Sequence, residues 1–290
     1  MSGSNYFSKK QVKMLPNLPL KIEKMPQTKI VEMHNHEFLE IAFVASGTAL
    51  HRHVDTRTGQ EYTNNLIPGD IFSIHTHEQH SYENCNNLIL YNIFILPEFL
   101  EKYPKLSDLK GYNLLIGKRT ELPRSLMHLP SNLMENISTS LDRAIKEFQL
   151  QLPGFDSMVI ALAMDFLITA MRSKEINYRE IGNARIILLK TICLLEENYP
   201  EQFTLAKLAK MSYMSVSSYT AKFRLALGMS PMDYLIKIRL SKAKELLTTT
   251  ELSINNIAEQ CGFCSSNYFI KLFRRTYQLT PLQFRKQEHK

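Results

Sequence analysis

The segment SINNIAEQCGFCSSNYFIKLFRRTYQLTPLQF (residues 253–284) repeats the pattern of TLAKLAKMSYMSVSSYTAKFRLALGMSPMDY (residues 204–234). Leu208 recurs 49 residues later as Ile257, and Phe223 recurs 50 residues later as Phe273. Chance rarely preserves apolar, small and capping residues at one offset. Two copies indicate the duplication of one structural unit and not a solenoid, which needs three or more repeats.

Each copy predicts a helix-turn-helix. Thr204 and Ser253 are side-chain caps that open a first helix of apolar periodicity, and Ser215 and Ser265 cap a second helix. The second helix carries aromatic residues four positions apart, which share one face and pack in the core. Its opposite face stays free for the major groove of DNA. A helix expected over residues 231–247 joins the two copies.

The second copy resembles the DNA-binding domain of the AraC/XylS family of bacterial transcription regulators. The family pattern is present as Ile254-x2-Ile257-Ala258-x3-Gly262-Phe263-x-Ser265-x2-Tyr268-Phe269-x3-Phe273-Arg274-Arg275-x4-Thr280-Pro281-x2-Phe284-Arg285. The resemblance covers about 100 residues. It departs from the family where a Gly usually precedes Thr-Pro, because Tyr277-Gln278-Leu279 stands there, and we expect a different helix C-cap.

The positive charge is concentrated in the duplicated part. The chain carries a net charge of +7. Residues 184–290 hold 16 Lys and Arg against 8 Asp and Glu, an excess of +8, whereas residues 1–183 sum to −1. Lys and Arg neutralise phosphates and supply most of the non-specific affinity for nucleic acid. The predicted partner is therefore double-stranded DNA.

Early, outward positions of each second helix should reach base edges. The expected base-reading residues are Ser217, Thr220, Ala221, Ser266, Asn267, Tyr268 and Lys271. The first-copy residues are small, so we expect that copy to read sequence weakly; Asn and Lys in the second copy can pair with adenine and guanine. The expected phosphate contacts are Lys222, Arg224, Arg239, Lys242, Arg274, Arg275 and Arg285.

The N-terminal part predicts a small β-barrel. Residues 38–44 and 88–96 are rich in β-branched and aromatic residues, and glycines mark the turns. Seven of the nine histidines lie between His34 and His80. The patterns His34-x-His36-x3-Glu40-x6-Gly47 and Pro68-Gly69-Asp70 with His80-x3-Asn84 resemble the two motifs of cupins. The resulting fold class is α+β: a cupin-like β-barrel plus helices, then an all-α domain with two helix-turn-helix motifs.

The cupin resemblance implies that His34, His36, Glu40 and His80 converge inside the barrel. Alternation places the first three on one strand face. They could hold a divalent Zn, Fe, Mn or Ni ion, or form a metal-free pocket for a sugar or other small polar effector. A third interpretation gives some of these histidines no role. No cofactor is certain. His51, His53, His75 and His77 match no motif position, and we expect them to be exposed or at the rim.

Helices are expected over residues 131–172. Residues 158–171 are almost wholly apolar, which fits either a buried intrachain helix or the dimer contact that the family resemblance implies. We expect an effector-binding and dimerisation domain at 1–172 (barrel 29–97), a linker at 173–183 and the DNA-binding domain at 184–290. Cys261-x-x-Cys264 could form a redox or half-zinc site, but the turn of the second motif favours a structural role.

The composition excludes other locations and classes. There is no run of 18 apolar residues, and the N-terminus lacks an apolar signal region, so we expect a cytoplasmic protein without a membrane partner. The predicted function is a non-enzymatic, DNA-binding transcription regulator that senses a small molecule, acts as a homodimer and contacts RNA polymerase. The alternatives are a metal-dependent cupin enzyme or a metal sensor fused to a DNA-binding domain. The sequence names neither the effector nor the operator.

Overall fold

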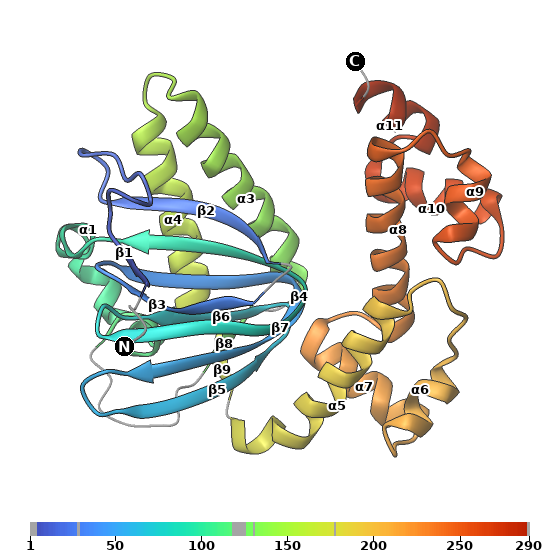
Figure 1. Ribbon diagram of the computed structural model, residues 1–290, viewed down its shortest axis with the longest axis horizontal. Helices are drawn as coiled ribbons and strands as arrows, with labels where there is room; N and C mark the ends of the chain where they lie inside the picture. The colour runs from blue at the N-terminus through green and yellow to red at the C-terminus, as the bar shows by residue number, and fades with distance from the viewer. Residues whose placement is uncertain (1–4, 28–29, 118–125, 130, 177, 289–290) are drawn as a thin grey trace. The chain divides into compact units, whose positions relative to one another are not determined.

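The structure is a computed structural model that describes residues 5–27, 30–117, 126–129, 131–176 and 178–288. Side chains are described except at residues 5, 131–132 and 174–187. The chain divides into two compact units, Met1–Leu189 and Lys190–Lys290 (Figure 1). Lys29, at the expected start of the barrel, and residues 118–125 lie outside the described residues.

The first unit is built on a sheet in which the described residues form nine strands. They are β1 (Asn5–Phe7), β2 (Leu20–Gln27), β3 (Val31–His36), β4 (Leu39–Asp55), β5 (Gln60–Leu66), β6 (Asp70–Ile74), β7 (Glu78–Ile95), β8 (Leu126–His128) and β9 (Lys174–Ile176). The main order is β1-β3-β7-β4-β6-β8-β9, with β2 added on β7 and β5 on β4. β1 pairs parallel with β3, and the remaining pairs are antiparallel.

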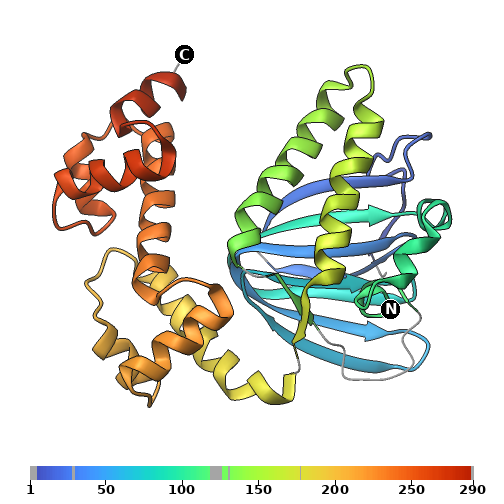
Figure 2. The same ribbon diagram turned by 180° about the vertical axis from the view of Figure 1, so that it is seen from behind.

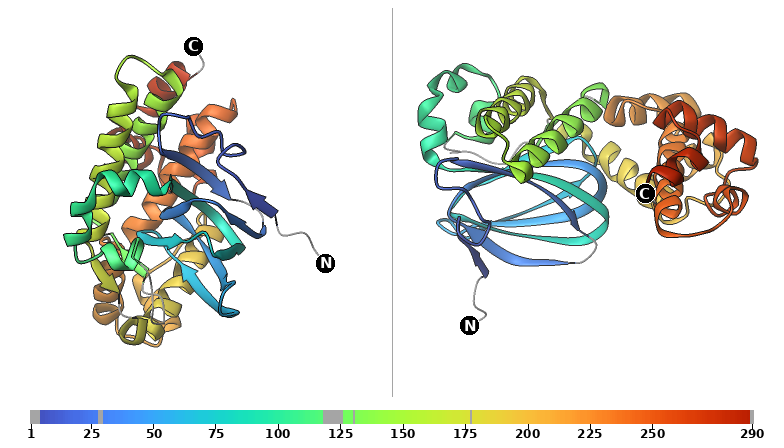
Figure 3. Two further views of the ribbon diagram at one scale, coloured as in Figure 1. Left: turned by 90° about the vertical axis from the view of Figure 1, so that its left-hand side faces the viewer. Right: turned by 90° about the horizontal axis from the view of Figure 1, so that it is seen from above.

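The two long strands bend the sheet back on itself. β4 pairs with β7 along its length, but its first half also pairs with β6 and its second half with β5. The register shifts where the halves meet, between Val44 and Leu50. Gly47 lies at this bulge with φ +74°, and a Cβ there would lie 2.2 Å from the Asn87 carbonyl oxygen. Only glycine fits such a close approach, and the bend produces the rolled sheet seen in Figure 3.

The two faces of the sheet have different partners. Ile41 and Phe43 point to one face, which is covered by α3 (Ser131–Leu150) and α4 (Phe155–Arg172), as Figure 2 shows. Ala42 and Val44 point to the other face and line the interior of the roll. The smaller elements α1 (Pro97–Lys102), η1 (Pro104–Asp108) and α2 (Tyr112–Leu115) follow β7. The predicted cupin-like fold class is therefore confirmed.

The segment expected to be a linker is structured. It contains β9, which pairs with β8, and the first turns of α5 (Tyr178–Glu197). α5 thus begins within the expected linker, and the chain boundary between the two compact units falls inside α5, between Leu189 and Lys190. Helix propensity carries across residues 178–183 because that stretch contains no proline.

The second unit contains both predicted helix-turn-helix motifs. Its further helices are α6 (Leu205–Met211), α7 (Val216–Leu227), α8 (Pro231–Thr249), α9 (Ile254–Gln260), α10 (Ser266–Tyr277) and α11 (Pro281–Glu288). The four predicted N-caps each accept a backbone hydrogen bond three residues on, as in Thr204 from Lys207 and Ser253 from Asn256. α8 opens with a capping box of Ser230 and Asp233.

The unusual C-cap of the second motif is confirmed. Gln278 follows α10 with φ +60°, the left-handed conformation that Gly228 adopts after α7. Its backbone N–H donates to the Arg274 carbonyl, so the helix ends as a glycine-capped helix would. The side-chain amide of Gln278 donates to the Arg275 carbonyl at 3.2 Å, which satisfies one further carbonyl of the last turn.

Candidate functional site

The second helices of the two motifs each present one buried and one exposed face. Tyr219 and Phe223 of α7, and Phe269 and Phe273 of α10, are buried. The outward faces are polar or small. Of the predicted base-reading residues, Ser217, Ala221, Asn267, Tyr268 and Lys271 are exposed, and Ser266 is half-buried. This is the geometry that lets a recognition helix enter a groove while its other face packs in the core.

Thr220 departs from the prediction. Its side-chain hydroxyl is buried, with no hydrogen-bond partner among the described residues. The residue follows buried Tyr219 on α7 and is itself half-buried. Its rotation on the helix turns the hydroxyl toward the core, so Thr220 is not placed to touch a base.

Four predicted phosphate-contacting residues carry exposed side chains. They are Lys222, Arg224, Arg274 and Arg275. Within the described part of the chain, none of the four has an ion-pair partner. Lys242 differs because its Nζ lies 3.1 Å from the Glu245 carboxylate. An unpaired surface cation keeps its full charge for a phosphate.

Arg239 has a structural role instead of the predicted phosphate contact. The residue is 7% exposed. Its Nε donates to the Tyr199 carbonyl and its Nη2 to the Glu201 carbonyl, both at 2.7 Å. The guanidinium also lies 6.0 Å from the ring centre of Phe263, and burial lowers the pKa of Arg239. Its donors therefore tie α8 to the segment that follows α5, and a charge so enclosed is not available to DNA.

Arg285 is also partly committed to the fold. Its Nη2 donates to the Leu252 carbonyl at 2.7 Å, which fastens α11 to the loop before α9. The side chain is half-buried, unlike those of Arg274 and Arg275. The sequence pattern did not separate these arginines, because spacing records helix face and not the carbonyls that a folded loop presents.

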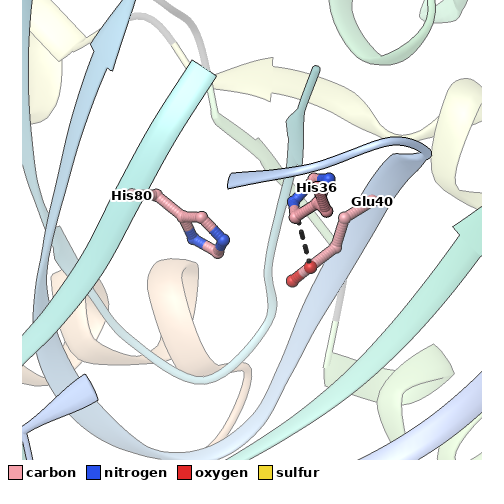
Figure 4. Close-up of side chains that lie close together, drawn as sticks. All are labelled: His36, Glu40 and His80. Atoms are coloured by element: carbon pink, nitrogen blue, oxygen red, sulfur yellow. Dashed lines mark ion pairs between the residues drawn. The ribbon is translucent and has the colours of Figure 1, made fainter. Parts of the chain in front are cut away.

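The four barrel residues predicted from the cupin motifs lie together in the structure. His36 Nε2 lies 3.4 Å from Glu40 Oε2, and both side chains are buried (Figure 4). The His80 ring is 5.4 Å from that of His36 and 4.1 Å from that of His34. His34 and His36 each have Nδ1 against a backbone carbonyl, of Glu32 and Phe38 respectively, at 2.8 Å. This contact directs the Nε2 atom of His36 toward Glu40.

Burial keeps this cluster uncharged. It lowers the pKa of His36 to about 4 and that of His80 well below its usual value. It raises the pKa of Glu40 to about 8, with a further rise from the charge of Glu23. Burial therefore favours the neutral forms of both His36 and Glu40.

The interior holds more polar groups than the motifs predicted. His51 and His53 are 1% and 2% exposed, so the expectation of exposed or rim residues was wrong for both. Their rings lie 5.3 Å apart, and that of His51 lies 5.6 Å from that of His80 and 5.0 Å from that of Tyr82. His51 and His53 share one strand face because they are two positions apart, but they lie an odd number of residues after Glu40. The bulge between Val44 and Leu50 shifts the alternation and turns both histidines inward. His75 and His77 are half-buried.

The donor set could hold a metal. His36, Glu40 and His80 each offer one ligand atom, and the three atoms lie within 4.8 Å of one another. Both His80 nitrogens, Glu40 Oε1 and the Tyr82 hydroxyl are buried without a hydrogen-bond partner among the described residues. Such atoms indicate a bound group, since buried polar atoms are otherwise paired. The residues therefore fit a divalent ion or a small polar molecule.

Of the Cys-x-x-Cys pair, Cys261 packs in the core of the second motif. Cys261 is buried, and burial raises its pKa to about 11; Cys264 is exposed. Neither belongs to a group of metal-ligating side chains found among the described residues. A thiol with a raised pKa is a poor nucleophile and metal ligand.

Comparison with known proteins identifies the family. Residues 208–287 match the helix-turn-helix domain, and residues 20–152 match the AraC-like ligand binding domain. The chain is 30% identical over 275 residues to the HTH-type transcriptional activator RhaS of Enterobacter sp. (strain 638), covering 92% of each chain. The chain belongs to the AraC family. The activator RhaR of the same strain is 29% identical over 270 residues, covering 92% of this chain and 91% of that one.

A solved domain of a response regulator is also similar. The C-terminal domain of the response regulator yesN from Fusobacterium nucleatum is 41% identical, covers 36% of this chain and 98% of its own, and has a TM-score of 0.33. The two matched domains are a helix-turn-helix domain and a ligand-binding domain, and the relatives are transcriptional activators. This protein is therefore a DNA-binding transcription regulator with a ligand-binding domain, and not an enzyme. None of the described helices could cross a membrane.

Proposed function

We propose that this protein is a one-component transcription activator whose barrel binds a small polar molecule and whose two helix-turn-helix motifs bind DNA. Two sets of side chains, one in each part of the chain, carry the proposal. One is a set of buried, unpartnered polar atoms inside the barrel, and the other is a set of exposed cations on α7 and α10. Activation is proposed because the relatives are named as activators. The domains are proposed at 1–172 and 184–290, joined through 173–183.

In the DNA-binding domain, α7 and α10 would enter successive major-groove segments about 34 Å apart. Asn267 and Lys271 would read bases by hydrogen bonds. Lys222, Arg224, Arg274 and Arg275 would contact phosphates and fix the register. Ser217 and Ala221 offer small contacts only, so the first motif would contribute position more than sequence.

In the barrel, imidazole nitrogens, a neutral carboxyl and phenol oxygens would hydrogen-bond a neutral ligand rich in hydroxyls, such as a sugar. Tyr82 and Glu40 both present neutral O–H groups at neutral pH, because burial raises their pKa values. His80 can donate from one nitrogen and accept at the other. A neutral, hydroxyl-rich ligand suits this set because none of its members supplies a fixed charge.

A divalent ion is the second candidate ligand, favoured by the close approach of His36, Glu40 and His80. The ion would hold oxygen atoms of a ligand or serve as the sensed species itself. Binding of a metal ion requires a deprotonated Glu40, and the ion itself would supply the positive charge that stabilises the carboxylate. If the ion itself is the sensed species, the protein would be a metal sensor and not a sugar sensor.

Homodimerisation, contact with RNA polymerase and action in the cytoplasm complete the proposal. Dimerisation would use the helices that follow the barrel. Ile160, Leu162 and Met164 of α4 support this, because they stay partly exposed although they are apolar. A ligand can regulate such a dimer only if it binds its two states with unequal affinity.

The test begins with genome-wide mapping of bound sites, which supplies both the operator and the neighbouring genes. Thermal melting of the purified protein against pentoses, hexoses, deoxyhexoses and divalent ions should then show one class that raises the melting temperature. His80→Gln should abolish that shift and leave operator binding without ligand intact. Failure of the full-length protein to bind any operator in a salt-dependent way would contradict the proposal.

A further inference from the structure

The polar strip inside the barrel extends beyond the cluster described above. On β4 and β7 the cross-strand pairs are His51 with Tyr82, His53 with His80, and Asp55 with Glu78. Successive inward residues of a strand are two positions apart, so the three pairs follow one another along one face. All six side chains are buried. The third pair, Asp55 with Glu78, has no role in the sites described above.

The third pair is accompanied by a histidine. His77 Nε2 lies 3.7 Å from Asp55 Oδ2 and 3.6 Å from Glu78 Oε1. The three ligand atoms lie within 4.8 Å of one another. Glu78 is fully buried, Asp55 nearly so, and the His77 side chain is 27% exposed, so the group has one side open to solvent.

Neighbouring groups hold these side chains in place. The His75 backbone N–H donates to Glu78 Oε2, and the Arg57 backbone N–H donates to Asp55 Oδ1, both at 2.9 Å. The other oxygen of each carboxylate is the one that faces His77. The His77 carbonyl accepts from the Thr56 backbone N–H and hydroxyl. Hydrogen bonds that orient the metal-ligating side chains in this way are typical of metal centres.

We propose that Asp55, His77 and Glu78 form a second, rim-located site for a divalent transition-metal ion. One imidazole nitrogen and two carboxylate oxygens are borderline-to-hard ligands that suit Zn²⁺, Mn²⁺, Fe²⁺ or Co²⁺. The open side at His77 leaves room for water to complete the coordination. The site shares no ligand with His36, Glu40 and His80, and it is independent of what the barrel interior binds.

Arg57 makes the proposal sharply testable. Its Nη2 lies 2.8 Å from Asp55 Oδ2 and its Nε 3.2 Å from Oδ1, so its charge stands beside the proposed ion. The side chain is 57% exposed and can move into solvent. A cation next to a metal ion weakens binding by repulsion and by competing for the carboxylate. Arg57→Ala should therefore tighten metal binding, whereas Glu78→Gln should weaken it.

The experiment uses the full-length protein, stripped with a chelator and titrated with Zn²⁺ and Co²⁺ against a chromophoric competitor. It is done in the wild type and in a His36→Ala/His80→Ala background, where barrel ligands no longer contribute. We expect one ion to remain in that background. Glu78→Gln or His77→Ala should lower the affinity by about 10–100-fold, and Arg57→Ala should raise it severalfold. If the double variant fails to fold by circular dichroism, the wild-type stoichiometry should still fall by one ion in Glu78→Gln.

Controls separate a metal site from a simple ion pair. Glu61→Gln removes an exposed carboxylate that pairs with Arg52 on the outside of the sheet, and it should leave metal affinity unchanged. Absence of a bound ion in the folded double variant would overturn the proposal. So would a Glu78→Gln protein whose melting temperature falls in chelator while its metal affinity equals that of the wild type. Operator binding in chelator reports on the proposed regulatory function separately.

Discussion

The two helix-turn-helix motifs have nearly the same skeleton and very different surfaces. α6 and α9 each span 7 residues, and α7 and α10 each span 12. Both second helices start at a serine cap and end at a residue in the left-handed conformation. Their aromatic pairs, Tyr219 with Phe223 and Phe269 with Phe273, lie 6.1 and 5.6 Å apart. The duplicated features are therefore those that build the fold.

The outward-facing side chains of α7 and α10 differ in length and polarity. Ser217, Ala221 and the 84%-exposed Leu225 of α7 occupy the positions of Asn267, Lys271 and Arg275 in α10. Each exchange places a longer polar or charged side chain in the second motif. A surface change of this kind costs little stability, so it can alter recognition without altering the skeleton.

The turns also differ, and the reason is local packing. Gly262 has φ +77°, and a Cβ on it would lie 2.4 Å from the Pro200 carbonyl oxygen. Tyr213 takes the corresponding left-handed position in the first turn with φ +52°, and its side chain is 98% exposed. The left-handed conformation is therefore needed in both turns, but glycine is needed only where the backbone of another segment approaches.

The largest expected effect tests whether the two cores are equivalent. Phe223 and Phe273 are both fully buried at matching positions. Replacing either by Ala should destabilise the DNA-binding unit by about 3–5 kcal/mol, since a large cavity is left in a packed core. Denaturant unfolding followed by circular dichroism measures this. A loss below about 1 kcal/mol in one variant alone would show that the motifs are not energetically equivalent.

The next effect concerns a polar contact that only the first motif has. Tyr234 donates to Glu196 at 2.7 Å, whereas the second motif has Phe284 in the matching place. Burial raises the pKa of Glu196 from 4.5 to about 7. The folded state therefore keeps a proton that the unfolded state has lost, so the stability contribution is complete below about pH 4.5 and is lost as the pH rises through 7.

Glu196→Gln should remove that pH dependence. The variant should equal the wild type near pH 4.5 and exceed it by about 2–3 kcal/mol at pH 8, because Gln needs no ionisation. Unfolding curves at several pH values measure the difference, with Glu197→Gln as the exposed control. Equal slopes for wild type and Glu196→Gln between pH 5 and 8 would contradict the assignment.

A third prediction sharpens the difference in base reading. Lys271→Ala gives α10 the residue that α7 has at the matching position, Ala221. It should lower the free-energy preference for the correct base at one base pair by about 1–3 kcal/mol. Arg275→Ala should weaken binding to all DNA sequences alike, and it should lower the slope of log affinity against log salt concentration by about one unit. Selection of binding sites from random DNA measures the first, and titration over a salt series measures the second. Indistinguishable behaviour of the two variants would refute the assignment of roles.

The smallest expected effect lies at the C-caps. Gln278→Gly places the residue that left-handed backbone favours after α10 and should stabilise the unit by about 0.5 kcal/mol. The reverse change, Gly228→Gln, should destabilise it by a similar or larger amount. Thermal melting measures both variants. A destabilised Gln278→Gly protein would show that the amide contact of Gln278 to the Arg275 carbonyl outweighs the backbone preference.

Prediction from the sequence succeeded where the signal was local or periodic. Capping serines and the aromatic spacing of α7 and α10 follow from near-neighbour chemistry. Gly47 was expected to mark a turn, but it lies at the bulge within β4, because β4 continues through it to Asp55. The convergence of His36, Glu40 and His80 followed from motif spacing. The buried His51 and His53 were missed because no motif contains them, and because the bulge between Val44 and Leu50 reverses the alternation counted from Glu40. Thr220 and Arg239 were misplaced because one helical rotation or one nearby carbonyl changes the role of a side chain.

The sequence by itself determined that this chain has a rolled sheet followed by two matched helical motifs, because period, capping and charge are written along the chain. Only the tertiary structure decided which polar groups share an environment. The pairing of β4 with β7 brings Asp55 to Glu78 and His53 to His80, and the segment after α5 brings carbonyls to Arg239. These contacts join residues far apart in the chain, and burial then sets their charge, so no local pattern records them.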